Sequence, residues 1–86
     1  MSFRNELLLI KAKIAEKKKR LQELDLRANN HIITIRSIVD ANAYDEDFTE
    51  IELDRAKAAM DDFYAIWNEA KDLKTQISKL EREVNG

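Results

Sequence analysis

The chain has 86 residues, a formal net charge of −2, a hydrophobic content of 44% and a charged content of 37%. A chain of this length forms one domain, residues 1–86, and it buries only about 60–65% of the surface that its unfolded form exposes, so its stability is small. The lack of cysteine excludes a disulfide framework, and one glycine with no proline argues against tightly turned strands. This composition is typical of long, exposed helices.

No segment approaches the roughly 18 apolar residues that cross a bilayer, because the apolar residues 7–10 are followed directly by Lys11. A secretory signal is not expected either, since most of the lysines follow this apolar run rather than precede it. We therefore expect a cytoplasmic protein with no membrane partner.

Apolar residues recur every three or four positions along the first half of the chain, which predicts an amphipathic helix over about residues 3–40. The average step of 3.5 residues is that of a coiled-coil seam. This first seam consists of Phe3, Leu7, Ile10, Ile14, Leu21, Leu24, Ala28, Ile35 and Ile38, interrupted by Lys17 and His31.

The alternative is a break in this helix at residues 29–30. Asn29 and Asn30 are poor helix formers, and the β-branched residues 32–35 follow them. A break would give three helices, but the seam keeps its phase through both asparagines. The pattern therefore favours a kink over a break.

Residues 40–47 lack the apolar pattern, and the residues after them predict the start of a second helix. Thr49 is the predicted cap, with its hydroxyl accepting from the Glu52 backbone and the Glu52 carboxylate reaching back in a capping box. Phe48 and Leu53 flank this start as a hydrophobic staple. The second helix is predicted over about residues 50–84.

A second, uninterrupted seam runs along this helix, and it consists of Ala56, Ala59, Phe63, Ile66, Ala70, Leu73, Ile77, Leu80 and Val84. A short connection between two such helices predicts an all-α fold, an antiparallel two-helix coiled-coil hairpin. Facing residues then have numbers that add to 87, which pairs Leu7 with Leu80, or to 94, which pairs Leu24 with Ala70. The seams fit both registers.

Beside the seams, the apolar face broadens in the half of the hairpin nearest the turn. The added residues are Ile32, Val39, Leu53, Met60 and Trp67, whereas the equivalent stripe near the termini holds Lys11, Lys18, Lys74 and Glu81. Two helices can each cover one seam, so the broad face predicts a further packing surface. A homodimer with a four-helix section is the simplest occupant, another protein's helix is the next, and partial exposure without a partner is the third.

The charges are also divided along the chain. Residues 1–20 hold seven Lys or Arg against two Glu, whereas residues 40–54 hold seven acids and no base. An antiparallel overlap of two turn halves would bring each acidic turn toward the other copy's basic cluster, Lys17, Lys18, Lys19 and Arg20. Binding of nucleic acid by this cluster is the weakest hypothesis, because no aromatic residue is interleaved with it and the chain is net negative.

The acidic tip, Tyr44, Asp45, Glu46 and Asp47, supports a rival hypothesis in which the hairpin presents its tip to a basic site on a larger complex. An EF-hand pattern begun at Asp40 puts Asp45 where glycine is required and Ile51 where a bidentate glutamate is required, so no metal site is predicted. In outline, this arrangement resembles the finger of the Gre-type transcript-cleavage factors. Residues 42–47 do not match the glycine-containing tip motif of that family, so no site residue follows from the resemblance.

Catalysis is not predicted. The sequence has no nucleophile paired with a base, no glycine-rich phosphate loop and no helical motif that sets two metal ligands on one face. We therefore expect no cofactor and no small-molecule substrate, and the sequence identifies no specific biochemical activity.

Overall fold

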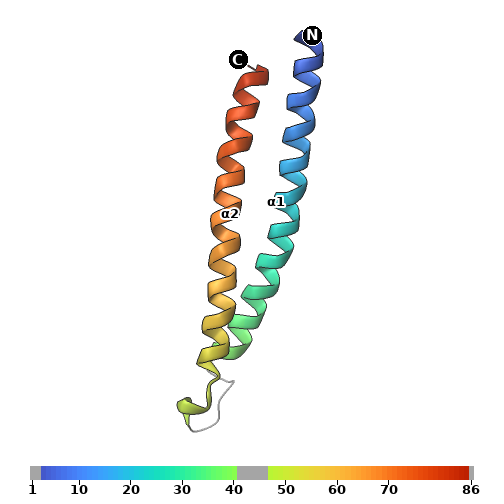
Figure 1. Ribbon diagram of the computed structural model, residues 1–86. Coiled ribbons are helices and arrows are strands. Elements are labelled where there is room, and N and C mark those ends of the chain that lie inside the picture. The colour runs from blue at the N-terminus through green and yellow to red at the C-terminus, as the bar shows by residue number, and fades with distance from the viewer. Residues whose placement is uncertain (1–2, 41–46, 86) are drawn as a thin grey trace.

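The computed structural model describes residues 3–40 and 47–85 as two long helices and one short turn of 3-10 helix. Helix α1 spans Phe3–Val39, the 3-10 turn η1 spans Phe48–Glu50, and α2 spans Leu53–Asn85. The two helices run antiparallel along a body of 69 × 17 × 15 Å (Figure 1). The predicted all-α hairpin is therefore confirmed. Within the described ranges, neither helix is long and apolar enough to span a bilayer.

Helix α1 continues through Asn29 and Asn30 without a break, so the three-helix alternative is wrong. The Thr34 hydroxyl donates to the Asn30 carbonyl at 3.0 Å, and the Ser37 hydroxyl donates to the Thr34 carbonyl at 2.8 Å. Hydroxyls that bond back to the helix in this way bend it slightly rather than end it. A gentle bend of α1 is visible in Figure 1.

The predicted capping box at Thr49 is wrong. Thr49 donates both its backbone N–H and its hydroxyl to the Asp47 carboxylate, at 2.9 and 2.6 Å, so its N–H is not left for Glu52. An aspartate commonly bonds the backbone two residues ahead, and here that bond begins η1 rather than an α-helix. Helix α2 begins only at Leu53, three residues later than predicted.

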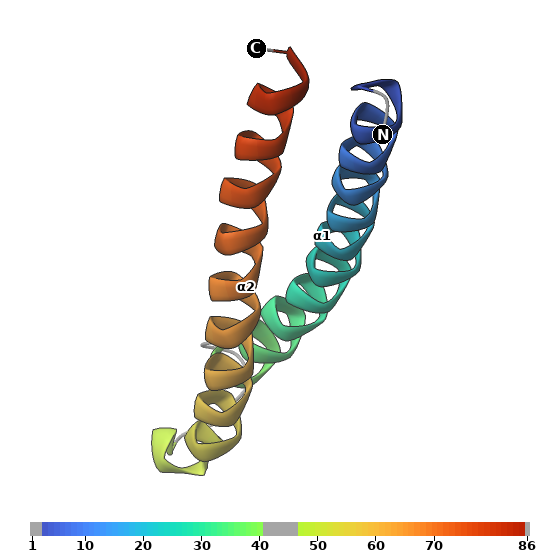
Figure 2. The same ribbon diagram turned by 45° about the horizontal axis from the view of Figure 1, so that its top comes forward.

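The buried core is concentrated toward the turn. Leu24 is the most buried side chain at 1% exposure, and the other buried apolar residues are Ile38, Ala56, Ala59, Ile66 and Ile77. Ala56 and Ala59 are small, so the two backbones can approach closely beside the turn. Figures 1 and 2 show the helices close together there and farther apart toward the termini.

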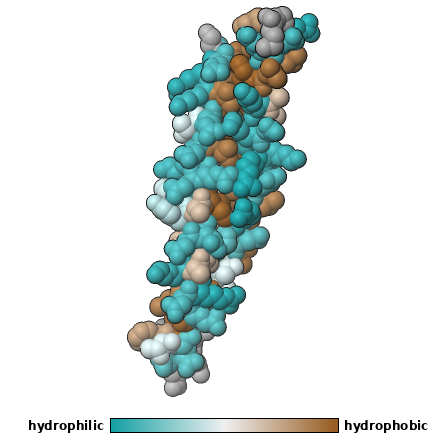
Figure 3. Space-filling view, viewed as in Figure 1, coloured by the Kyte–Doolittle hydropathy of each residue, from teal (hydrophilic) through white to brown (hydrophobic). Residues whose placement is uncertain are grey.

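The terminal half is less closed than the predicted two-stranded coiled coil. Its α1 seam residues Leu7, Ile10 and Ile14 are only half-buried. Hydrophobic surface also gathers at the terminal end in the view of Figure 3. The predicted seam residues are therefore only partly buried in the terminal half, and they do not form a closed core there.

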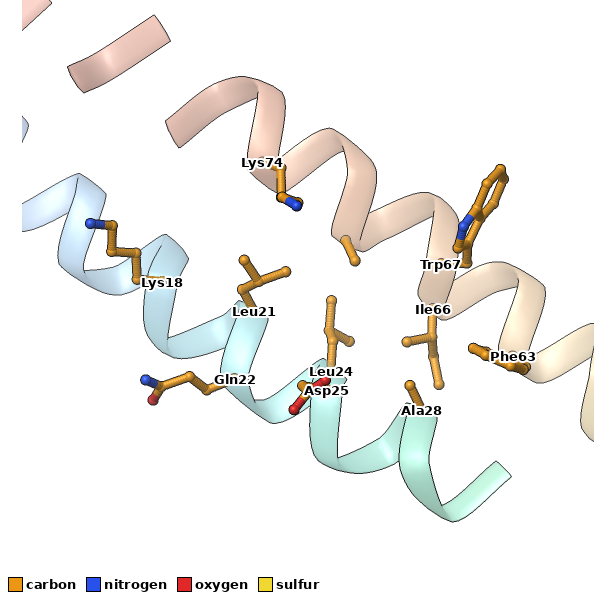
Figure 4. Close-up of a pocket in the computed structure, with 11 residues that line it drawn as sticks. Lys18, Leu21, Gln22, Leu24, Asp25, Ala28, Phe63, Ile66, Trp67 and Lys74 are labelled. Carbon is orange, nitrogen blue, oxygen red and sulfur yellow. The ribbon is translucent and has the colours of Figure 1, made fainter. Parts of the chain in front are cut away.

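The structure selects the register in which facing residue numbers add to about 94. Lys17 donates to Gln76 at 2.6 Å and Arg20 to Glu69 at 2.7 Å. These pairs add to 93 and 89, and the Lys18–Glu81 ion pair adds to 99, so the three pairs between the helices centre on about 94. Figure 4 shows Ala28 beside Ile66, whose numbers add to 94. In this register small residues face large ones, because Ala28 faces Ile66 and Ala70 faces Leu24.

Candidate functional site

The hairpin has two unlike sides, and one of them is closed by polar bonds between the helices. The Arg20 guanidinium donates to both carboxylate oxygens of Glu69, at 2.7 and 3.1 Å, and the Lys17 ammonium donates to the Gln76 amide oxygen at 2.6 Å. We call the side that carries these bonds the ion-pair face. A bidentate Arg–carboxylate pair fixes geometry better than a single contact.

The Arg20–Glu69 pair shifts the titration of both partners. The hydrogen bond from Arg20 lowers the pKa of Glu69, and the positive charges of Arg20 and Arg27 add to this effect. The same hydrogen bond raises the pKa of Arg20. Glu69 is therefore ionised throughout the neutral range and down into the acid range.

The lowered pKa of Glu69 predicts a pH-dependent contribution to stability. A carboxylate whose pKa is lower in the folded state stabilises the fold above its unfolded pKa of about 4.3 and loses this effect as the pH falls through its folded pKa. We expect Glu69→Gln to lower the thermal midpoint at pH 7, and we expect its difference from the wild type to shrink as the pH is lowered toward 3. Glu16→Gln, at an exposed position of α1, is the control and should change little at either pH. An effect of Glu69→Gln that persists unchanged at pH 3 would contradict the prediction.

The opposite side of the hairpin contains a groove of about 630 Å³ between the helices. Figure 4 shows Leu24 and Ala28 of α1 directed toward Ile66 of α2, with Trp67 at one end of the groove and Lys18 at the other. The lining residues are Lys18, Leu21, Gln22, Leu24, Asp25, Ala28, Phe63, Ile66, Trp67, Ala70 and Lys74. The interior is mainly apolar, and the charged residues lie along its edge.

Small seam residues explain why this side is hollow. The register places Ala28 and Ala70 where two larger side chains would otherwise fill the space between the helices. Leu24 remains buried, but no third helix or strand covers the side chains beside it along the groove. A groove lined by apolar side chains with a few charges at its edge is a common form of binding site for a helix.

Aromatic side chains extend the groove along α2. The rings of Tyr64 and Trp67 stack with centroids 5.5 Å apart, and the Lys71 ammonium lies 4.3 Å from the Trp67 ring centroid. A second hollow of about 180 Å³ is lined by Met60, Phe63, Tyr64 and Trp67. Trp67 is nevertheless 46% exposed, so a large aromatic surface is held in place and left uncovered.

The stripes that the sequence singled out lie along this groove. Lys18 and Asp25 line it from α1, Trp67 and Lys74 line it from α2, and Lys18 pairs with Glu81 at 3.3 Å. We define the groove face as the groove together with one stripe of residues on each helix that borders it. Within each stripe, successive residues are seven positions apart. On α1 they are Lys11, Lys18, Asp25, Ile32 and Val39, and on α2 they are Leu53, Met60, Trp67, Lys74 and Glu81.

Of the five predicted interface residues, Trp67 lines the groove, and Met60 and Trp67 line the second hollow. Ile32, Val39 and Leu53 line neither and belong to the groove face only through their stripes. Val39, Leu53, Met60 and Trp67 are exposed, and Ile32 is half-buried. Sequence reasoning missed Tyr64 and Lys71, although they lie three residues before and four residues after Trp67, where helix neighbours meet. It also missed that seam residues such as Leu21 and Phe63 would line an open groove.

Most of the predicted acidic tip, Tyr44, Asp45 and Glu46, lies outside the described residues. Asp47 is described and exposed, and its carboxylate bonds to Thr49. The hydrogen bond from the Thr49 hydroxyl, followed by that from the Thr49 backbone, lowers the pKa of Asp47. Asp47 therefore carries its negative charge into the acid range.

The basic cluster does not form one patch. Successive side chains on a helix point about 100° apart, so its four members face different directions. Lys17 and Arg20 bond to Gln76 and Glu69 on the ion-pair face, Lys18 pairs with Glu81 on the groove face, and Lys19 is exposed. Across residues 3–40 and 47–85, no group of three or more histidine, aspartate or glutamate side chains could hold a metal ion.

Comparisons with known proteins do not assign this site. No family model matches the chain, and neither the curated proteins nor the solved structures include a significant match.

Proposed function

We propose that this chain is a small protein-interaction module that self-associates through its groove face. The observation that carries the proposal is that Val39, Leu53, Met60 and Trp67 are exposed on one side of the hairpin, next to an apolar groove. Solitary exposed apolar residues are normal in a soluble protein, but a contiguous set of them usually marks a contact surface.

The extent of exposed surface supports a partner of substantial size. The chain exposes 7071 Å², whereas a compact folded monomer of its mass would expose about 5,300 Å². The excess is about twice the 800 Å² that each partner contributes to a typical stable interface. A second hairpin could therefore cover a full interface without any change in the helices.

The two faces differ in what it costs to cover them. Covering the ion-pair face would remove charged groups such as Arg20 and Glu69 from water, which is expensive. Covering the turn half of the groove face, which holds Leu53, Met60 and Trp67, removes mainly apolar side chains from water. Burial of that surface contributes roughly 25 cal/mol per Å². The groove face is therefore the favoured side for contact with another helical surface.

Sedimentation equilibrium tests the proposal directly. The wild type is expected to have twice the 10.1 kDa mass of one chain at micromolar concentration. Trp67→Glu places a charge among the exposed apolar residues of the groove face and should weaken association by more than about 30-fold, as expected for an aromatic residue that is buried in an interface. Ala65→Glu is the matched control, because residue 65 is exposed and about 200° around the helix from residue 67.

Two outcomes would overturn the proposal. A wild type that is monomeric at all concentrations would exclude self-association and return attention to the acidic-tip hypothesis. A Trp67→Glu variant that dimerises as strongly as Ala65→Glu would remove the groove face as the contact surface. Helical content measured by circular dichroism shows that each variant is folded.

A further inference from the structure

We propose that the two copies pack groove face to groove face with their turns at opposite ends, so that Met60 of one copy lies against Met60 of the other. This inference rests on the proposed self-association and adds its symmetry. It specifies which residues meet, where the two-fold axis passes, and what covers each groove.

The apolar stripe on α2 is symmetric about Met60. Leu53 precedes Met60 by seven residues and Trp67 follows it by seven, so each lies about 10.5 Å away along the helix. In a two-fold interface, both copies contribute the same surface. If residue i of the first copy contacts residue j of the second, then residue j of the first copy also contacts residue i of the second. With the axis at Met60, each Leu53 lies against the Trp67 of the other copy, and every apolar residue of this stripe meets another apolar residue.

The register between the two helices also brings the stripe on α1 to this axis. The register of about 94 sets Ile32 level with residue 62, within two residues of Met60. Ile32 of one copy therefore meets Ile32 of the other when Met60 meets Met60. A single two-fold axis, perpendicular to the length of the hairpin, therefore passes near both Met60 and Ile32. On α1 it sets Val39 of one copy at the height of Asp25 of the other.

Charge decides between this arrangement and its alternative, in which the two turns lie side by side. Residues 40–54 contain seven acids and no base, so turns placed together would bring fourteen negative charges into one region. When the turns lie at opposite ends, Lys74 lies 14 residues, or about 21 Å, from the axis. It lies on the side of the axis where Asp47, Glu50 and Glu52 of the other copy are found. Lys18 lines the same end of the groove as Lys74 but is paired with Glu81 at 3.3 Å, so the positive charge that faces each acidic turn end is mainly that of Lys74.

The arrangement with the turns at opposite ends also covers each groove. Val39 and Leu53 of one copy lie at the height of Asp25 and Trp67 of the other, and those two residues line the groove. The turn end of each hairpin therefore covers the groove of its partner. The overlap extends over the turn halves, where the structure has its exposed apolar stripes.

Single cysteine substitutions test this symmetry, because the chain has no cysteine of its own. Only a residue close to a two-fold axis can form a disulfide with its own copy, since the two Cα atoms must lie within about 7 Å. Under mild oxidation, Met60→Cys is expected to form a covalent dimer in high yield. Asp61→Cys is the matched control, because its exposed side chain points away from the groove face, and it should remain uncoupled.

Mixtures of two variants establish the direction of packing. Leu53→Cys mixed with Trp67→Cys should give the mixed disulfide well above either self-coupled product. If the turns instead lie side by side, α1 of one copy lies over α2 of the other. Ile32→Cys mixed with Met60→Cys would then couple while Met60→Cys alone would not, and that result would overturn the inference.

Sedimentation measures self-association itself, so it distinguishes a failure of the proposed symmetry from a failure of the proposed function. A wild type that dimerises while Met60→Cys fails to couple would overturn the symmetry and leave self-association standing. A monomeric wild type would overturn both. Met60 is half exposed in the single hairpin, so its replacement leaves the fold of each copy intact.

Discussion

Leu24→Ala is expected to lower the free energy of unfolding by about 2–5 kcal/mol. Leu24 is the most buried side chain among the described residues, with 1% of its surface exposed. It faces Ala70, which is too small to move into the space that a shortened side chain would leave. In a chain of this size each kcal/mol corresponds to about 4–8 °C in the thermal midpoint, so we expect a decrease of roughly 8–40 °C. Thermal unfolding followed by circular dichroism measures this change.

Leu26→Ala is the matched control, because it makes the same chemical change two residues away. Leu26 is 67% exposed, and a substitution at such a position usually changes stability by less than about 0.5 kcal/mol. If the two variants lost equal stability, the assignment of Leu24 to the core would be wrong.

Lys17→Leu should have the opposite effect and stabilise the hairpin by about 1–2 kcal/mol. Lys17 occupies a seam position and is half-buried, while its ammonium leaves the seam to bond to Gln76. Leucine at this position would complete the first seam, and the lost surface hydrogen bond is worth less than the apolar surface that becomes buried. We expect a rise of about 4–16 °C in the thermal midpoint.

The control for Lys17→Leu is Lys19→Leu, which makes the same change at an exposed position of α1 outside the seam. This variant should leave the midpoint nearly unchanged. A midpoint of Lys17→Leu at or below that of the wild type would show that the ammonium contributes more than the seam does. Polar residues at seam positions can also fix oligomeric state and register, so the sedimentation of Lys17→Leu should be measured alongside.

The two helices could be predicted because the apolar pattern extends over many turns and one substituted position hardly weakens it. Lys17 and His31 interrupt the first seam, yet α1 continues through both. The start of α2 could not be predicted from the same pattern. Thr49 and Asp47 each offer a side chain to nearby N–H groups, and sequence alone does not say which forms the bond. The carboxylate of Asp47, which is a stronger acceptor than a hydroxyl, makes it.

The register and the groove depend on contacts between residues far apart in the chain. A shift of one heptad preserves both seams, so only contacts across the helices, such as the bond of Lys17 to Gln76, select one register. The groove follows from the register, because it needs Ala28 and Ala70 on the same stretch of the hairpin. Sequence reasoning therefore found the border of the groove, at Met60 and Trp67, but not its interior.

The uneven packing of the seam also implies an order of folding. Ile38 faces Ala56 across a loop of 18 residues, whereas Ile14 faces Leu80 across a loop of 66 in the same register. Closing the longer loop first would cost about 1 kcal/mol more chain entropy. The contacts that are cheapest to form are thus also the best packed, so the hairpin should nucleate beside its turn and close toward its termini. The apolar stripe around Met60 is then complete early, before the open end of the hairpin has closed.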